Sequence, residues 1–309
     1  MKRVELPHGV VVTTFARPPA SFNPTIASAA ELVRFGFPLR PTEPKLSKLY
    51  DRAMRRMGRF HYLEPVFDVI AEKTSKHGKR VVPDISEGRQ TTNNWSGAQV
   101  VAPANDSIQF VMAEFVVPNA SSPSGIQNFS SSHWIGIDDG SDICQTGVEC
   151  NGLVGNKSAF YAWFQWYPGP LMKIPNFIVS AGDMLNVLIC TDSGYGSTGA
   201  TIYFTNEISG IYTSFRVQAP PGTVLSGNCA EWISEVPELG GLVNPIALAD
   251  FGEVFFSSCY AGTVNGAAIT SADGDFIDML ALDNQTVVCS GTQVSSDVVR
   301  TLYEGPIPV

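Results

Sequence analysis

After residue 93 the chain alternates apolar and polar positions in the way that half-buried β-strands require. The apolar runs are rich in Val, Ile, Phe, Tyr and Trp, and Gly, Asn, Asp, Ser or Pro separates each run from the next. The predicted strands are 99–102, 108–117, 133–138, 159–167, 184–190, 201–205, 213–218, 230–235, 253–260, 276–282 and 286–290. Because no helical pattern interrupts them, we expect an all-β domain, either a β-sandwich or a barrel.

The residues before this domain show a different pattern. Prolines break residues 1–40 into short pieces, so this part is predicted to be irregular. From residue 42 to 57 apolar residues recur at helical spacing, with Thr42 available as an N-cap and Pro44 in the first turn. Gly58 is expected to end this helix.

Charge divides the chain near the same point. Residues 1–90 contain 16 Lys and Arg against 9 Asp and Glu, a net charge of +7, whereas residues 91–309 contain 4 against 20, a net charge of −16. Three of the cations, Arg52, Arg55 and Arg56, are predicted to cover the polar side of the helix, and the basic run 73–80 predicts an exposed linker. We therefore expect two parts, a basic segment at 1–90 and an acidic β-domain at 91–309.

This charge distribution suits an acidic environment. A domain with few cations gains little positive self-repulsion when its carboxylates are protonated, and such repulsion is a main cause of acid unfolding. An ordinary acidic protein would show the same balance, so the composition leaves both interpretations open.

No stretch of the sequence predicts a membrane span or a secretion signal. Gly, Pro, Ser or a charged residue breaks every apolar run well before the roughly 18 residues that a spanning helix needs. Lys2 and Arg3 stand near the N-terminus, but no apolar core of about 7–15 residues follows them. We expect neither a membrane nor nucleic acid among the partners.

All six cysteines lie in the β-domain, at positions 144, 150, 190, 229, 259 and 289. Six cysteines allow three disulfides in fifteen connectivities, and we expect disulfides without being able to choose among them. The spacing lacks the paired Cys-x-x-Cys motifs of a zinc site, and His133 is the one histidine of this part of the chain. No metal or other cofactor is expected.

Several common catalytic arrangements do not fit the β-domain. A Ser or Cys nucleophile needs a histidine base, and no Ser stands in a Gly-x-Ser-x-Gly motif. The run 191–194, Thr-Asp-Ser-Gly, has the composition of an aspartic-peptidase loop, but that chemistry needs two such carboxylates and there is no second copy. The acidic run 138–142 lacks the later acid that completes a calcium loop.

Carboxylates on strands remain as candidates, and the run 229–235 carries two of them among large apolar residues. A carboxylate beside Trp and Ile loses hydration, so it must be paired, exposed in a cleft or retained for chemistry. Because side chains alternate along a strand, Glu231, Ile233 and Glu235 share one face while Trp232 and Ser234 share the other. If the faces of neighbouring strands coincide, one cleft contains Glu231, Trp134, Trp163 and Gln165.

Six motifs in order carry a resemblance to a known family. They are Asn94-Trp95-Ser96-Gly97-Ala98, Trp134-Ile135-Gly136-Ile137-Asp138, Gln145-Thr146-Gly147-Val148, Tyr161-Ala162-Trp163-Phe164-Gln165-Trp166-Tyr167-Pro168, Ser180-Ala181-Gly182-Asp183 and Ala230-Glu231-Trp232-Ile233. In order and spacing this series resembles the glutamic peptidases, or eqolisins, of the scytalidoglutamic and aspergilloglutamic type. The resemblance covers nearly all of residues 93–309.

The resemblance implies a concanavalin-A-like β-sandwich of two antiparallel sheets and cleavage of proteins in acid without a metal. By motif position the catalytic dyad falls on Gln145 and Glu231. Glu231 would act as the base that activates water, and Gln145 would hold that water and donate to the oxyanion. The substrate-binding residues implied in the same way are Trp134, Asp138, Glu149, Trp163 and Gln165.

Two positions depart from the family pattern. Gln165 stands where the family usually carries an acid, and Glu149 is the acid that follows the Gln-Thr-Gly-Val motif. We expect these changes to alter the pH optimum or substrate preference.

The family also implies a role for the first ninety residues, because its members are made with a basic pro-segment. We expect residues 1–90 to inhibit the domain at neutral pH and to be released in acid, with cleavage between Lys73 and Asn93. A permanent accessory region is the alternative. The resemblance further implies a secreted protein in acidic surroundings, although no signal peptide is visible in this numbering.

Two other functions are compatible with the residues alone. A β-sandwich glycoside hydrolase would pair Glu231 with Glu149 or Glu235, and a non-catalytic carbohydrate-binding protein would use the aromatic cleft. The Gln145 amide distinguishes the peptidase from the glycoside hydrolase, because a glycosidase needs two acids and does not need Gln145.

Overall fold

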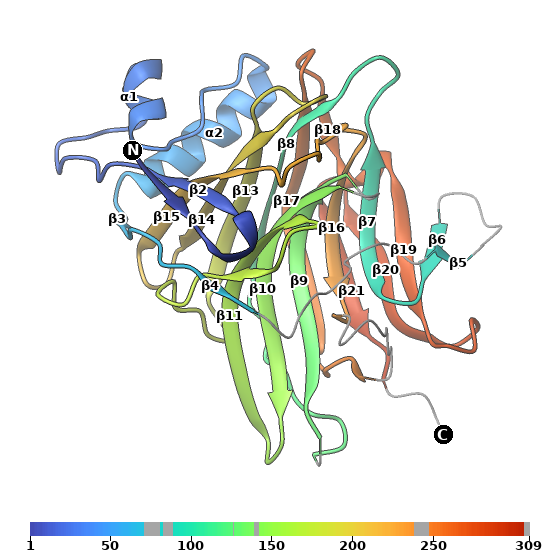
Figure 1. The fold of residues 1–309 in the computed structure, drawn as a ribbon. Helices are drawn as coiled ribbons and strands as arrows, with labels where there is room; N and C mark the ends of the chain where they lie inside the picture. The colour runs from blue at the N-terminus through green and yellow to red at the C-terminus, as the bar shows by residue number, and fades with distance from the viewer. Residues whose placement is uncertain (71–80, 83–88, 126, 139–141, 238–246, 306–309) are drawn as a thin grey trace.

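The computed structural model describes residues 1–70, 81–82, 89–125, 127–138, 142–237 and 247–305 (Figure 1). The strands are β1 (Lys2–Glu5), β2 (Val11–Thr14), β3 (His61–Tyr62), β4 (Asp68–Val69), β5 (Val81–Val82), β6 (Arg89–Thr92), β7 (Trp95–Val101), β8 (Ile108–Val116), β9 (Phe129–Ile137), β10 (Ile143–Leu153), β11 (Lys157–Tyr167), β12 (Met172–Lys173), β13 (Met184–Thr191), β14 (Gly199–Asn206), β15 (Ile211–Gln218), β16 (Cys229–Glu235), β17 (Glu253–Thr263), β18 (Ala268–Thr270), β19 (Asp275–Leu280), β20 (Val287–Ser295) and β21 (Val298–Tyr303). The α-helices are α1 (Ala29–Arg34) and α2 (Pro44–Met57). The prediction of an all-β domain is confirmed.

The strands pair mostly antiparallel, in two series that β17 joins into one hydrogen-bonded network. The first series runs β1, β2, β15, β14, β13, β8, β17. The second runs β12, β11, β10, β9, β16, β7, β19, β20, β21, β17. Strand β17 belongs to both because its first four residues pair with β21, whereas Ser257 and, after a shift of register, Tyr260–Thr263 pair with β8.

The main hydrophobic core lies between the two series. It contains Ile135 and Phe164 from the second series together with Val187 and Phe215 from the first, and all four side chains are buried. The rings of Phe164 and Phe215 lie 4.8 Å apart between centroids. Burial of the apolar faces of both series, at about 25 cal/mol per Å², is the main favourable term that holds them together.

A second buried cluster covers the opposite face of the second series. This tryptophan cluster consists of Trp95, Trp134, Ile143, Trp163, Leu171, Ile233 and Ile277. The second series is therefore buried on both faces. This explains why its strands carry large apolar residues at successive positions, as in the Ala-Glu-Trp-Ile run of β16.

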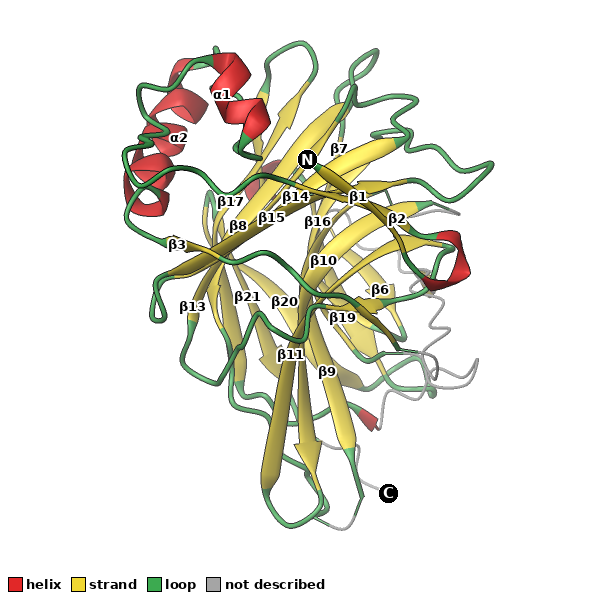
Figure 2. Ribbon diagram, turned by 60° about the vertical axis from the view of Figure 1, so that its left-hand side comes forward, coloured by secondary structure: helices red, strands yellow, loops and turns green. Residues whose placement is uncertain are grey.

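The N-terminal residues form strands that pair within this network. Strand β2 pairs with β15, with Val12 opposite Val217, and β1 continues the first series beyond it. Helices α1 and α2 lie together beside the strands of the first series (Figure 2), where Met54 and Tyr50 join a small cluster with Tyr212 of β15. The prediction that residues 1–40 are irregular is therefore wrong, because β2 is stabilised by a pairing about two hundred residues away that no local pattern reveals.

Helix α2 confirms the predicted helix at 42–57, with one difference at its start. Glu43, and not Thr42, caps it by accepting a 2.7 Å hydrogen bond from the Leu46 backbone N–H, and Gly58 follows its last residue. The basic run 73–80 and most of the expected cleavage region lie outside the described residues. No helix among the described ranges is long and apolar enough to cross a membrane.

The expectation of disulfides is wrong, since no disulfide links any of the six cysteines, all of which lie in the described part of the chain. Cys144 and Cys150 lie six residues apart on one strand, about 20 Å along β10, whereas a disulfide needs Cα atoms within about 7 Å. The register sets Cys144 opposite Ile137 and Trp166, so no thiol faces it. Burial raises the pKa of Cys190 to about 12, and this thiol stays protonated.

Candidate active site

The strand register brings polar side chains into one line across five neighbouring strands. Gln165 of β11 is opposite Gln145 of β10, and Gln145 is opposite Gly136 of β9. Gly136 is in turn opposite Glu231 of β16, and Glu231 is opposite Gln99 of β7. Residues directly opposite each other in an antiparallel pair point to the same face. We call these five residues the polar row.

Gly136 gives the polar row a gap at its centre. Gln145 and Glu231 lie two strands apart, about 9–10 Å between their backbones, and the residue between them has no side chain. A Cβ atom added to Gly136 would lie 3.0 Å from Glu231 Oε2 and 2.8 Å from Trp134 Cζ3. The gap therefore lies between the two predicted catalytic groups, and a single methyl group would crowd it.

Glu231 is fully buried and is fixed through one of its two carboxylate oxygens. Gln99 donates a 2.9 Å hydrogen bond from Nε2 to Glu231 Oε1, and the Cys229 thiol lies 3.7 Å from the same oxygen. The other oxygen, Oε2, is the one near Gly136. The contacts at Oε1 thus direct Oε2 toward the gap.

Gln145 is held in a similar way on the other side of the gap. Its Nε2 donates to Gln165 Oε1 at 3.0 Å, and Gln165 Nε2 donates to the backbone carbonyl of Gly169 at 2.8 Å. Since a carbonyl only accepts, the Gly169 bond fixes which way the Gln165 amide points, and that amide fixes Gln145. Gln145 Oε1 is buried and has no hydrogen-bond partner among the described residues.

Aromatic side chains line the next row of the same face. Trp134 and Trp163 lie on either side of Gly147 in the register, and both are fully buried. The Trp134 indole N–H donates to Glu235 Oε2 at 2.8 Å, which fixes the ring beside the gap. Glu235, which the sequence suggested only as a glycosidase partner of Glu231, is therefore the residue that orients Trp134.

Glu149 lies on the same face, one row beyond the tryptophans. The register sets it opposite Tyr161 of β11 and Ser132 of β9. Burial, together with the nearby Glu149 carboxylate, raises the pKa of Tyr161 far above its usual value, so the phenol stays neutral. Glu149 thus shares the face of the dyad but lies along the strand from it.

Asp138 does not line the gap. It follows β9 with a φ of 69°, and its carboxylate turns toward the loop that leads into β16. Asp138 accepts hydrogen bonds from the backbone N–H groups of Ser226, Gly227 and Asn228 at 2.6, 3.1 and 2.7 Å, and from the Ser226 hydroxyl at 2.9 Å. Burial raises the pKa of Asp138, and these four donors act in the opposite direction. Its contacts position the strand that carries Glu231.

Sequence reasoning missed Gln99 and the strand that holds Gln145. The predicted strand 99–102 begins at Gln99, but no role was predicted for this residue. A Gln beside the apolar residues Ala98, Val100 and Val101 is the signal in the sequence that could have indicated a functional side chain. Strand β10 was not predicted because Gln145, Thr146 and Gly147 interrupt its apolar pattern. Among the described residues no three His, Cys, Asp or Glu side chains are grouped to hold a metal ion.

The N-terminal residues contact this face from both edges. At one edge β4 pairs with β12, and Ile70 packs against the tryptophan cluster. At the other edge β6 pairs with β19, and Gln90 Nε2 donates to Asp275 Oδ2 at 2.8 Å and to Gln99 Oε1 at 3.4 Å. Gln145 and Glu231 are both 0 % exposed in this arrangement, so a substrate does not reach them.

A family model decides the class of the protein: the peptidase A4 model matches residues 93–303, which include the whole polar row. The chain belongs to the peptidase A4 family. It is accordingly a peptide hydrolase, and the resemblance to the glutamic peptidases is confirmed. Aspergillopepsin-2 of Aspergillus niger is 27% identical over an alignment of 234 residues that covers 69% of this chain and 78% of the relative. Scytalidopepsin B of Scytalidium lignicola is 26% identical over an alignment of 216 residues that covers 67% of this chain and 78% of the relative.

Solved structures show the same fold for this peptidase. A crystal structure of scytalido-glutamic peptidase with a transition state analog inhibitor superposes with a TM-score of 0.57 at 23% identity and covers 68% of this chain and 98% of that one. The aspergilloglutamic peptidase from Aspergillus niger gives a TM-score of 0.50 at 27% identity and covers 57% of this chain and 99% of its own. In both cases nearly the whole known enzyme corresponds to part of this chain.

Proposed function

We propose that this peptidase is an acid endopeptidase in which Gln145 and Glu231 activate one water molecule over Gly136. The observation that carries the proposal is the register, which sets the two side chains on either side of a residue without a side chain. The water would occupy the gap, within reach of Glu231 Oε2 and of the Gln145 amide. No metal takes part in the proposed reaction.

Each group has a role that its contacts support. Glu231, when ionised, takes a proton from the water as it attacks the scissile carbonyl and then returns that proton to the leaving amine. Gln145 uses one N–H for Gln165, which leaves its second N–H to donate to the oxyanion that forms in the transition state. An amide donates at any pH, so the oxyanion contact persists in acid. Trp134, Trp163 and Glu149 line the face on which the substrate would lie.

A carboxylate base suits acid better than the histidine that this domain also contains. A free Glu titrates near about pH 4.3, so part of it is ionised where a free His is protonated. His133 lies on the other face of the sheet, bonded to the Ser234 hydroxyl at 2.8 Å, and burial lowers the pKa of His133 to about 3. It is a structural residue and does not face the gap.

The glycoside hydrolase alternative fits the geometry poorly. Glu231 and Glu235 are four residues apart on β16, about 13 Å between backbones, and Glu235 is already bound to the Trp134 indole. Glu149 is separated from Glu231 both by two strands and by four residues along them. Paired glycosidase carboxylates lie about 5–10 Å apart.

Kinetics of two variants test the dyad. We expect Gln145→Ala to lower kcat by about 10²–10³-fold and Glu231→Gln by about 10³-fold or more in proteolysis of an acid-denatured protein at about pH 3–4. The matched controls are Gln218→Ala and Glu253→Gln, which change exposed residues on β15 and β17. Activity of Glu231→Gln at the level of Glu253→Gln would remove the dyad from consideration.

The same proposal includes residues 1–90 as an inhibitory pro-segment. Its support is the contact that this segment makes with both edges of the polar row, the burial of Gln145 and Glu231, and the opposite charges of the two parts. Removal of the segment would leave residues 91–309 as a concanavalin-A-like sandwich, with the two strand series as its sheets. We place the working enzyme in acidic surroundings outside the cell.

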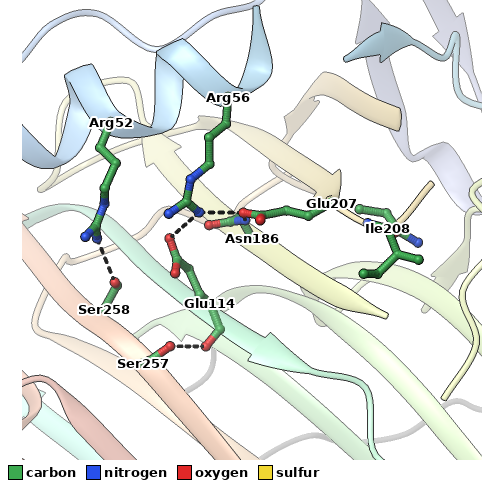
Figure 3. Close-up of polar contacts among 9 residues, drawn as sticks. Arg52, Arg56, Glu114, Asn186, Glu207, Ile208, Ser257 and Ser258 are labelled. Carbon is green, nitrogen blue, oxygen red and sulfur yellow. Dashed lines mark hydrogen bonds and ion pairs between the residues drawn. The ribbon is translucent and has the colours of Figure 1, made fainter. Parts of the chain in front are cut away.

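A charged cluster joins helix α2 to the strands beneath it (Figure 3), and this contact supports the proposed docking of the segment. Arg56 Nη1 lies 2.5 Å from Glu207 Oε1 and 3.4 Å from Glu114 Oε1, and Asn186 donates to the same Glu207 oxygen at 2.7 Å. Arg52 donates to the Ser258 hydroxyl at 3.3 Å. Arg56 therefore faces the β-strands and does not lie on an exposed polar side of the helix as predicted, because partly buried carboxylates on the sheet attract it.

This cluster does not by itself release the helix in acid. Burial is the largest effect on Glu114 and raises its pKa, while Arg56 and Arg52 lower it and Glu207 raises it further. A carboxyl whose pKa is higher in the docked state binds its proton more tightly there, so protonation of Glu114 favours docking. Release then depends on weaker attraction between the two oppositely charged parts and on cleavage of the chain.

Acid incubation tests the pro-segment separately from the dyad. Protein purified at neutral pH is brought to about pH 3–4, and its mass and its activity are followed together. We expect activity to appear as the N-terminal segment is lost, and more slowly when the Glu231→Gln variant is incubated alone. Full activity of an uncut chain would show that residues 1–90 are a permanent accessory region.

A further inference from the structure

One polar side chain of the buried face holds the proposed base but has no place in the dyad. Gln99 lies on β7, 4% exposed, directly opposite Glu231 in the register. Its Nε2 donates to Glu231 Oε1 at 2.9 Å and lies 3.4 Å from the Cys229 sulfur. Burying a Gln in a strand of Trp, Ala and Val is costly unless its amide is hydrogen-bonded.

The amide orientation of Gln99 is fixed at both ends. An ionised carboxylate only accepts hydrogen bonds, so the NH₂ group of Gln99 must face Glu231 and its oxygen must face away. On that far side Gln90 Nε2 lies 3.4 Å from Gln99 Oε1 and 2.8 Å from Asp275 Oδ2. The chain of contacts Asp275, Gln90, Gln99, Glu231 therefore has one consistent direction.

We propose that Gln99 is a positioning residue for Glu231, which holds Oε1 so that Oε2 stays over Gly136 with the ionised form favoured. The inference rests on the proposed role of Glu231 as the base. Gln99 touches neither the gap nor the proposed water, so it acts only through Glu231. Both residues lie after Asn93, so their contact persists after any cleavage that removes the N-terminal segment.

The surroundings of Glu231 make this donor important. The titratable groups that face it from the described strands include the Cys229 thiol on its own strand and, two strands away, Asp275. Its neighbours Gly136 and Gln145 carry no charge. A charge-assisted hydrogen bond in such a site stabilises the carboxylate more than a thiol does, because the thiol is a weak donor at 3.7 Å.

Two substitutions at this position separate positioning from packing. Gln99→Met keeps the length of the side chain but has no N–H, so the carboxylate loses its donor. We expect kcat/KM to fall about 10–100-fold and the acidic limb of its pH profile to move up by about one pH unit. Gln99→Glu donates only while it is protonated, so its activity should approach that of the wild type only at the acidic end, and its optimum should move to lower pH.

We therefore expect Gln99→Met and Gln99→Glu to shift the pH profile of kcat/KM in opposite directions. If Gln99 only filled space, neither substitution would shift the pH profile. The variants are assayed after acid activation of the full chain, with thermal unfolding to show that they fold and with Gln218→Met on exposed β15 as the control. If Glu231→Gln is inactive but Gln99→Met keeps the wild-type pH profile, the inference is wrong and the dyad stands. If Glu231→Gln is active, both are wrong.

Discussion

The gap at Gly136 gives the sharpest test of the proposed chemistry. Gly136→Ala adds one methyl group at a position whose backbone any residue can adopt, so no backbone strain accompanies it. The new Cβ would lie 3.0 Å from Glu231 Oε2 and 2.8 Å from the Trp134 ring, whereas ordinary contacts are about 3.5–4.0 Å. The carboxylate and the ring must therefore move by roughly 0.5–1 Å.

That displacement has two separable effects. Overpacking of this size costs about 1–3 kcal/mol, which should lower the Tm by roughly 3–10 °C in a domain of this length. A misplacement of about 1 Å at reacting groups costs about 10²-fold in rate. The added methyl group also occupies space assigned to the water, so we expect kcat/KM to fall at least about 10²-fold.

The assay is proteolysis in acid together with thermal unfolding of the same preparation. Gly262→Ala on β17 is the matched control, because its Cβ would meet the Phe110 ring at 2.0 Å, far from the polar row. It should lower the Tm at least as much as Gly136→Ala, while kcat/KM of the folded protein stays within about two-fold. A Gly136→Ala enzyme with normal kcat/KM would refute the idea that the gap holds the reacting water.

Three further substitutions have outcomes that the contacts determine. Burial lowers the pKa of His133 from about 6.5 in the unfolded chain to about 3 in the folded protein. As the pH falls from 7 to 3.5, His133 is therefore protonated in the unfolded state but stays largely neutral in the folded state, which lowers the free energy of unfolding by about 4 kcal/mol. His133→Gln should abolish this loss, and denaturant unfolding at both pH values measures it. Asp138→Ala removes four hydrogen bonds from the loop before β16 and should cost about 3 kcal/mol of unfolding free energy, which thermal unfolding would detect, whereas an unchanged Tm would contradict that role. Arg56→Met should loosen helix α2 by about 1 kcal/mol at neutral pH and by less in acid, where Glu114 is neutral, and hydrogen exchange of the helix measures the difference.

The missed elements show where local pattern stops being informative. Strand β10 carries Gln145 but lacks apolar alternation, because Gln145 and Gly147 serve the face of the sheet that holds the polar row. Strand β2 is stabilised by pairing with β15, and Arg56 of helix α2 contacts Glu114 of β8. Both β15 and Glu114 are distant in sequence from the residues that they contact. The number of cysteines predicted disulfides, but no disulfide links them, and the register sets Cys144 opposite Ile137 and Trp166.

The sequence by itself determined the all-β architecture, the division of charge at about residue 90, the alternation of faces in β16 and the six motifs that place the chain among the glutamic peptidases. Periodicity, composition and short motifs are local properties, so they are readable along the chain. Only the tertiary structure decided that Gly136 lies between Gln145 and Glu231, that Gln99 holds the carboxylate, that Asp138 serves a loop and that Glu235 orients Trp134. Those relations depend on pairing between strands up to 132 residues apart. Such long-range pairing, unlike periodicity, cannot be recognised from the sequence of either strand alone.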